Sequence, residues 1–272
     1  MLVLLFRLLS RVPLAWLQAF GRFLGLLVYA LPGRYRDRLQ QNAAQAGYAS
    51  RQFARRAAAE TGAAILELPW VWFRSDEALD RVTCSGLEVF HDARRAGKTI
   101  LFLTPHLGSF ELSARYGALL GPITVLFREP RHPRLGPLLE QARARSGVSI
   151  APANLQGVRR LVRALRSGEM VGILPDQVPG AGEGAWAPFF GRDAYTVTLP
   201  ARLARMPGVA VIGTACERLP AGKGWRLHFM AIDTPAPETP AEQAAWVNTI
   251  MENLIRICPH QYLWSYNRYK AP

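Results

Sequence analysis

A histidine and a glutamate stand five residues apart in the stretch TILFLTPHLGSFELSARY, which covers residues 99–116. His106 and Glu111 have the residue types of a general base and the acid that orients it. A carboxylate bonded to one imidazole nitrogen fixes the tautomer and makes the other nitrogen a stronger base, able to activate a hydroxyl. Residues five apart in one continuous helix point about 140° away from each other. Gly108 supplies the bend that would let the two side chains meet.

The spacing of this pair is a weak signal by itself. With 5 His and 20 acidic residues in 272, about 0.4 such pairs are expected by chance, so the motif needs a structural context. A second pair, His228 and Asp233, lies in a segment that alternates like a half-buried strand. Residues five apart on a strand face opposite sides, roughly 16 Å apart. We therefore interpret the second pair as structural and keep His106 and Glu111 as the candidate site.

The elements around the candidate pair predict an α/β fold. The apolar run 99–103 predicts a buried strand, and Ser109 is the predicted N-cap of a helix that carries Glu111. Further strands are predicted at 82–86, 123–127, 149–150, 169–174, 209–212 and 226–232, and helices at 34–72, 87–96, 157–167, 196–206 and 241–258. Strands that alternate with helices predict a largely parallel central sheet flanked by helices. Ligands collect at the carboxyl ends of such strands, where His106 is expected.

Composition narrows the class of partner. Half of the 272 residues are hydrophobic, enough for a sizeable core, while the formal net charge of +13 predicts an acidic partner. Nucleic acid, an anionic membrane and an acidic protein or phosphorylated substrate all fit that charge. The basic residues are interleaved through amphipathic helices and no nucleic-acid recognition motif is present, so we expect no nucleic-acid partner. The three cysteines lack metal-ligand spacing, so they predict a reducing compartment and no metal site.

The first 32 residues are predicted to be a membrane-anchoring helix, ahead of one domain over 33–272. This segment is strongly apolar and lacks a signal-peptide cleavage site. Residues 12–31 have about the length of a membrane span, but Arg22 lies inside them. A helix lying in the membrane interface is at least as well supported as a span. A buried helix of a soluble core is the remaining alternative.

Five short motifs follow one another in an order that resembles a known family. They are HLGSFE (106–111), FREP (127–130), GILPDQ (172–177), PFFG (188–191) and QYLWSYNRYK (261–270). Together they resemble the late acyltransferases of lipid A biosynthesis, the lauroyl and myristoyl transferases of the glycerolipid acyltransferase superfamily. The resemblance covers nearly the whole chain. It departs from the family pattern at Phe127, where a Tyr is usual, and at residues 266–270, where the family closes with His-Arg-Arg-Phe-Lys.

The resemblance implies transfer of a fatty acyl group from acyl carrier protein to a hydroxyl of a membrane lipid, a lipid A precursor above all. The implied location is the cytoplasmic face of the bacterial cell inner membrane. No cofactor is implied beyond the carrier thioester. Carried over by position, His106 is the general base and Glu111 its orienter. The implied substrate-binding residues are Arg128, Arg131, Asp176 and Gln177.

Two alternatives stay open at this point. The first is an acyltransferase for another membrane lipid, such as a lysophospholipid, an ornithine lipid or a glycolipid, using acyl carrier protein or acyl-CoA. The second is a non-catalytic peripheral membrane-binding protein, in which His106 and Asp176 would be structural and the loop arginines solvated. The pair Phe189–Phe190 is expected in the core rather than in the wall of an acyl-chain site. The sequence sets neither the acyl chain length nor the acceptor.

Overall fold

The computed structural model describes residues 2–127, 138 and 147–272, and its centre is a mixed sheet. The described residues form a seven-stranded sheet in the order β1-β9-β8-β2-β5-β3-β4. These strands are β1 (Val82–Ser85), β2 (Thr99–Leu103), β3 (Ile123–Phe127), β4 (Ser149–Pro152), β5 (Met170–Ile173), β8 (Val209–Arg218) and β9 (Trp225–Ala231). Strands β8, β2, β5, β3 and β4 are parallel, while β9 runs antiparallel to β8. The predicted largely parallel sheet is confirmed; at one edge β9 and β1, which are parallel to each other, run opposite to the other strands.

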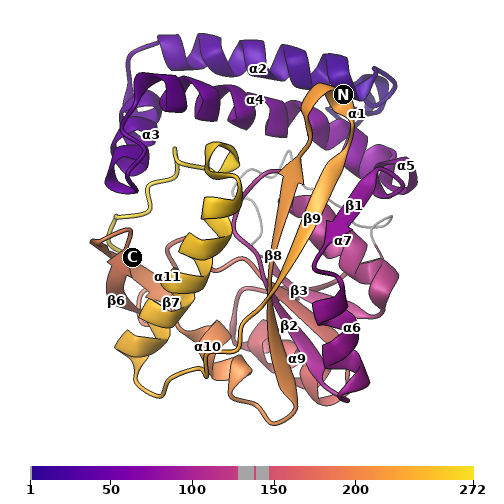
Figure 1. The fold of residues 1–272 in the computed structure, drawn as a ribbon, viewed down its shortest axis with the longest axis vertical. Helices are drawn as coiled ribbons and strands as arrows, with labels where there is room; N and C mark the ends of the chain where they lie inside the picture. The colour runs from indigo at the N-terminus through magenta and orange to yellow at the C-terminus, as the bar shows by residue number, and fades with distance from the viewer. Residues whose placement is uncertain (1, 128–137, 139–146) are drawn as a thin grey trace.

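Strand β2 separates two apolar cores. All five of its residues are buried, as the apolar run predicts. Because successive side chains of a strand point to opposite faces, Ile100 and Phe102 join one core and Leu101 and Leu103 the other. The first core lies under α6 (Glu88–Arg95) and α7 (Phe110–Leu120), and the second under α9 (Leu155–Arg166), α10 (Leu199–Ala204) and α11 (Pro240–Ile257). The sheet is therefore covered by helices on both faces (Figure 1).

The N-terminal helices cross one end of the molecule. They are α1 (Leu2–Leu9), α2 (Leu14–Ala30), α3 (Arg34–Gln45), α4 (Arg51–Phe73) and α5 (Ser75–Leu79). Figure 1 shows α2 and α4 side by side at this end, across the top of β8 and β9. Their contact requires glycine, because a Cβ on Gly21 would lie 2.5 Å from the carbonyl oxygen of Gly62, and a Cβ on Gly62 would lie 2.0 Å from that of Gly21. Most of the predicted anchor segment therefore packs directly on α4.

The outer face of α2 is apolar and exposed. Trp16 has 74% of its surface exposed, and Phe20, Phe23 and Leu27 are about half exposed. Among the described residues, no single helix is both long and apolar enough to cross a bilayer. The pair α1 and α2 together meets that criterion, but the chain bends by 119° between them. Membrane anchoring therefore stays a prediction.

A small hairpin that the sequence analysis did not predict packs beside α11. Strands β6 (Gly184–Phe189) and β7 (Arg192–Val197) pair antiparallel, so the helix predicted to start at residue 196 begins only at Leu199, in α10. Phe190 and Gly191 form the two-residue turn, both with positive φ (48° and 77°), as a type I′ turn requires. Phe189 and Phe190 are buried, which confirms their predicted place in the core. The described residues also form two short 3₁₀ turns, η2 (Pro220–Gly222) and η3 (Pro259–Gln261).

Candidate active site

His106 is held by a carboxylate from the neighbouring strand. It follows β2, and Asp176 follows β5, which pairs with β2 in parallel. The Nδ1 atom of His106 lies 2.7 Å from Oδ1 of Asp176, and the backbone N–H of His106 donates to Oδ2 at 2.9 Å. One carboxylate therefore fixes both the backbone and the ring of His106. With Nδ1–H donated to Asp176, Nε2 is the nitrogen left to act as a base.

The electrostatics of this pair follow from burial and mutual attraction. Burial alone would lower the pKa of His106, but the Asp176 carboxylate and its hydrogen bond, with a further contribution from Glu111, raise that pKa above its ordinary value. Burial alone would raise the pKa of Asp176, but His106 and the hydrogen bonds it makes hold that pKa below its ordinary value. Asp176 is therefore ionised at neutral pH and stabilises a protonated imidazole.

The loop after His106 is clamped by two other segments. Ser109 N–H donates to the carbonyl of Cys216 on β8, at 2.9 Å, and Gly108 N–H donates to the carbonyl of Gln261, at 3.0 Å. Gly108 has φ of 58°, and a Cβ there would lie 1.9 Å from the Cys216 carbonyl oxygen. Only glycine fits this bend. Ser109 precedes the first residue of α7, but its side chain makes no capping hydrogen bond.

Glu111 lies in the first turn of α7 and faces the same cavity as His106. Its Oε2 accepts a hydrogen bond from the indole N–H of Trp72 at 3.2 Å. The carboxylate bonded to the ring of His106 is that of Asp176, whereas the sequence analysis expects Glu111 in that position. The reason is topological: parallel pairing of β2 with β5 brings residue 176 beside residue 106, whereas the turn after Gly108 carries Glu111 to the cavity wall. The negative charge of Glu111 contributes to the raised pKa of His106.

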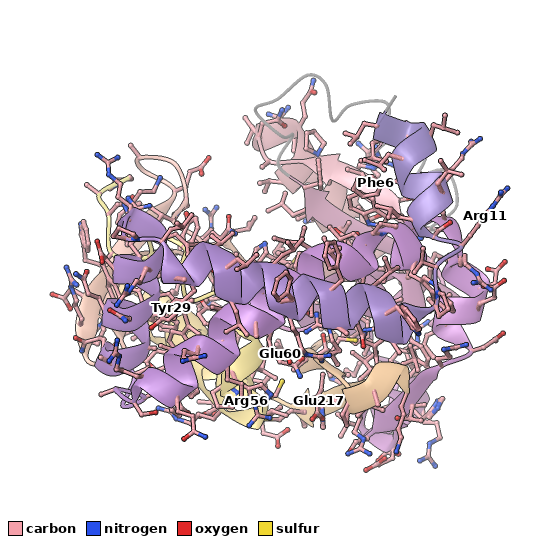
Figure 2. The ribbon with its side chains drawn as sticks, turned by 90° about the horizontal axis from the view of Figure 1, so that it is seen from above. Phe6, Arg11, Tyr29, Arg56, Glu60 and Glu217 are labelled. Carbon is pink, nitrogen blue, oxygen red and sulfur yellow. The ribbon has the colours of Figure 1, made fainter. Side chains whose placement is uncertain are left out.

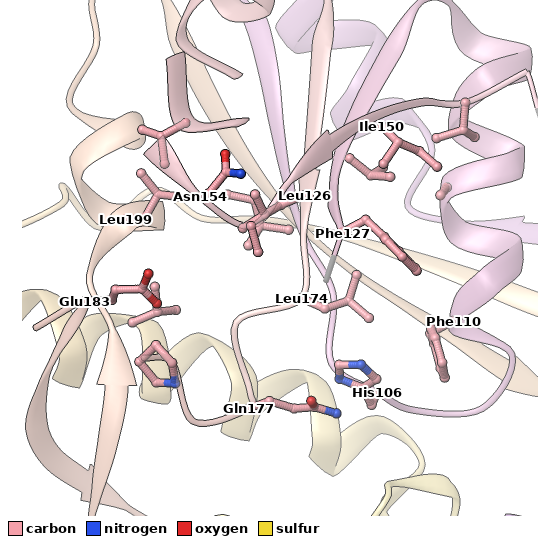
Figure 3. A pocket seen from close by; sticks show the side chains of 18 of the residues that line it. His106, Phe110, Leu126, Phe127, Ile150, Asn154, Leu174, Gln177, Glu183 and Leu199 are labelled. Carbon is pink, nitrogen blue, oxygen red and sulfur yellow. The ribbon is translucent and has the colours of Figure 1, made fainter. Parts of the chain in front are cut away.

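The imidazole opens onto an apolar cavity of about 590 Å³. Figure 3 shows His106, Phe110 and Gln177 at one end of it, with Leu126, Leu174 and Ile150 along its length. The ring of Phe110 meets the imidazole edge-on, with ring centroids 4.9 Å apart. Eight apolar residues of the lining lie in or next to β3, β4, β5 and the start of α9: Val125, Leu126, Phe127, Val148, Ile150, Ile173, Leu174 and Val158. The site therefore combines one positioned imidazole with a cavity lined mainly by apolar side chains.

A comparison with known proteins identifies the family. A sequence profile described as "Bacterial lipid A biosynthesis acyltransferase" matches residues 1–271. The chain belongs to this family. It is similar to the "Lipid A biosynthesis lauroyltransferase" of Escherichia coli (strain K12), with 30% identity over 213 residues that cover 77% of this chain and 69% of the relative. It is 29% identical over 214 residues, with the same coverage of each chain, to the "Lipid A biosynthesis palmitoleoyltransferase" of that strain. The protein is an acyltransferase, and the resemblance inferred from the five motifs is confirmed.

Of the remaining predicted site residues of the acyltransferase, the structure describes only Gln177. Gln177 lines the cavity beside His106. Arg128 and Arg131 lie outside the described residues. Within the described part of the chain, no group of three His, Cys, Asp or Glu side chains is placed to hold a metal ion.

Two further buried residues lie close to the imidazole–carboxylate pair and were not among the predicted site residues. Arg115 is buried, lines the cavity one turn after Glu111 on α7, and donates to the hydroxyl of Ser75 at 2.9 Å. The i,i+4 spacing of Glu111 and Arg115 on the predicted helix is a signal that could have found it. Tyr262 is also buried. Burial and the nearby Asp176 carboxylate raise the pKa of its hydroxyl well above the ordinary value. No local sequence pattern predicts that Tyr262 lies close to Asp176.

A second cluster of buried charges lies behind the loop that carries His106. The guanidinium of Arg218, on β8, binds Glu67 through Nε and Nη2, both at 2.7 Å, and Glu60 through Nη1 at 2.9 Å. Glu60 also binds Arg22 of α2 at 2.7 Å. Arg218 donates in addition to the carbonyl of Gly108 at 3.3 Å. This cluster connects the N-terminal helices to β8 and to the loop that carries His106. Figure 2 labels one of its members, Glu60.

Proposed function

We propose that this acyltransferase moves a fatty acyl group from the thioester of acyl carrier protein to a hydroxyl of a lipid A precursor. The observation that carries the proposal is the single imidazole whose Nδ1 is bonded to Asp176 and whose ring borders a long apolar cavity. The cavity suits an acyl chain, and the imidazole suits activation of a hydroxyl. The acceptor follows from the names of the relatives, and the donor from the resemblance of the motifs.

In the proposed mechanism, Nε2 of His106 takes the proton from the acceptor hydroxyl as its oxygen attacks the thioester carbonyl. The tetrahedral intermediate collapses, the C–S bond breaks, and the carrier thiolate leaves and regains the proton from the imidazolium. Asp176 takes the orienting role that the sequence analysis gives to Glu111, because it holds Nδ1. Glu111 stabilises the imidazolium through its charge. No covalent acyl-enzyme is needed.

The substrate-binding roles of the other predicted residues remain proposals. Gln177 is placed to donate from its amide to a substrate oxygen, because it lies beside His106 in the cavity (Figure 3). Arg128 and Arg131 would bind phosphate groups of the acceptor or stabilise the oxyanion, for which the planar guanidinium is suited.

We also propose that α1 and α2 attach the protein to the cytoplasmic face of the inner membrane. One face of α2 is occupied by α4, and the other exposes Trp16, Phe20, Phe23 and Leu27. A helix packed along its length on one side and apolar on the other is suited to lying in the membrane interface. Of the alternatives raised by the sequence, this arrangement favours interfacial attachment over a span.

The test is a transfer assay with purified protein, lauroyl-loaded acyl carrier protein and a tetra-acylated lipid A precursor, read by mass spectrometry. The wild type should add one acyl chain, and His106→Ala should lower kcat/KM by about 10³-fold or more, since a positioned base contributes about 10²–10⁴-fold. His228→Ala is the matched control. His228 also pairs with a carboxylate, Glu217 at 3.0 Å, and its side chain is 19% exposed, as is that of His106, but it lies on β9 and does not line the cavity.

Full activity of His106→Ala in a folded protein would overturn the assignment of the base. Absence of any acylated product from the wild type, with either the carrier-bound donor or lauroyl-CoA, would overturn the proposed acceptor. Faster turnover with lauroyl-CoA than with the carrier would overturn the proposed donor and leave the base in place.

A further inference from the structure

We infer that the outer face of α9 is the docking surface for an acidic carrier protein that delivers the acyl donor. This inference rests on the proposed function, because it names where the donor's protein binds. It is drawn from the charge of this helix, from the side chains it turns inward and from its place beside the cavity.

The charge of α9 is one-sided and has no acidic partner among the described residues. The helix, LQGVRRLVRALR, contains four arginines and no acidic residue. Leu161, Ala164 and Leu165 are buried against the sheet, while Arg159, Arg160, Arg163 and Arg166 are exposed. None of these four arginines forms an ion pair with a described residue. Basic residues in the last turn complement the helix dipole, but that effect needs only one or two of them.

The arginine face adjoins the cavity at the start of the helix. Asn154, Leu155 and Val158 line the cavity, and Asn154 caps α9 by accepting from Gly157 N–H at 3.0 Å. Leu155 is 66% exposed although it belongs to the cavity wall, so the wall continues onto the outer surface there. Arg159 is one turn further along, roughly 6 Å, and Arg166 is roughly 17 Å away. A carrier seated on the arginines would stand within reach of the cavity.

The position of α9 favours a protein over a membrane as the partner. In Figure 1, α9 lies at the opposite end of the long axis from α2, whose exposed aromatic face is the proposed membrane surface. A membrane-binding helix presents an apolar stripe between its basic residues, whereas α9 turns its apolar residues inward, with Leu155 the exposed exception. Four exposed guanidinium groups that pair with no described acid match carboxylate side chains on the surface of an acidic protein.

The experiment is a kinetic comparison of Arg159→Glu/Arg163→Glu with a charge-matched control, Arg51→Glu/Arg55→Glu. The control arginines are exposed at the start of α4, roughly 25 Å (Arg55) and 32 Å (Arg51) along that helix from Trp72, which lines the cavity. Each protein is assayed with lauroyl-loaded acyl carrier protein and with lauroyl-pantetheine, which carries the thioester without the protein. We expect the α9 variant to raise KM for the loaded carrier about tenfold and to leave turnover of lauroyl-pantetheine unchanged, and the control to change neither.

An unchanged KM for the loaded carrier in the α9 variant overturns the docking surface. Equal losses with both donors also overturn it, because they place the arginines in the substrate site itself. Weaker flotation with phosphatidylglycerol vesicles in the α9 variant, but not in the control, reassigns the face to the membrane. A wild type that uses lauroyl-pantetheine but not the loaded carrier overturns the proposed donor and is recognisable before any variant is made.

Discussion

Arg218 and His106 are both held by buried carboxylates on either side of the same loop, yet only one of them meets a cavity. The side chain of Arg218 is 0% exposed and is surrounded by Glu60, Glu67 and the Gly108 carbonyl. His106 uses one ring nitrogen for Asp176, and the edge of its ring borders open space. Charge pairing in the interior is therefore common to both clusters. What distinguishes the site is a titratable group with an unused atom and room for a substrate beside it.

The Arg218 cluster belongs to the architecture of the chain. It joins α2, α4 and β8 through Arg22, Glu60, Glu67 and Arg218, and Arg218 remains charged at any pH that the protein meets. Because Arg22 and Arg218 outweigh the effect of burial on Glu60, the pKa of that carboxyl lies below its ordinary value. This cluster can hold the N-terminal helices in place but has no proton to exchange with a substrate.

The largest effect on stability is expected from Arg218→Ala. Removing the guanidinium leaves Glu60 and Glu67 buried with too little positive charge, which costs about 3–5 kcal/mol for a broken buried pair. Chemical denaturation should show this loss. Adding Glu67→Ala should recover part of it, because the uncompensated carboxylate is then gone. A loss under about 1 kcal/mol in the single variant would remove the distinction between the two clusters, since Arg218 would then be dispensable to the fold.

Gly108→Ala should disturb both clusters at once. The new methyl group would meet the Cys216 carbonyl oxygen at 1.9 Å, and the residue would keep a φ of 58° that side chains disfavour. We expect a loss of at least about 2 kcal/mol in unfolding free energy and a lower kcat per folded molecule. Gly97→Ala is the control, because Gly97 also has a positive φ but no atom within 4 Å of its Cβ position. Equal effects of both changes would mean that the close approach of the loop to β8 is unimportant.

Trp72→Phe should have a smaller effect, confined to the cavity. It keeps the aromatic ring that stacks on Phe6 but removes the indole N–H that binds Glu111. Loss of one hydrogen bond to a charged group is worth about 1.5–3 kcal/mol when the group stays buried, and less for the half-buried Glu111. We expect kcat/KM to fall a few-fold with little change in the unfolding midpoint. A fall as large as that of His106→Ala would give Glu111 a more direct role than the structure indicates.

The fold was largely predictable because its strands are continuous apolar runs. The run 99–103 became β2 with the same bounds, and the run 123–127 became β3. The β6–β7 hairpin was missed because its turn uses Phe190 and Gly191, and Phe190 is not a usual residue at positive φ. Its strands also contain Gly184 and Pro188, which argue against a strand in isolation.

The site was predictable only where its residues are close in sequence. His106 was found from its place after a strand, but its carboxylate partner lies 70 positions later and is brought there by the pairing of β2 with β5. Arg218 and Glu67 are separated by 151 positions. Such partners depend on strand order, which local spacing does not encode. The sequence analysis therefore paired His106 with the nearby Glu111, whereas the fold pairs it with Asp176.

The most direct test of the account is the pH dependence of kcat/KM for the wild type, Asp176→Asn and Glu111→Gln. The base must be neutral, so the rate should rise with pH through the pKa of His106, which Asp176 and Glu111 hold above its ordinary value. Removing the Asp176 charge should move this rising limb to lower pH and reduce the plateau rate. Glu111→Gln should move it in the same direction by less. The claim is that Asp176 orients the imidazole of His106 and is the main cause of its raised pKa. A rising limb that stays in place in Asp176→Asn, or that shifts more in Glu111→Gln than in Asp176→Asn, would contradict it.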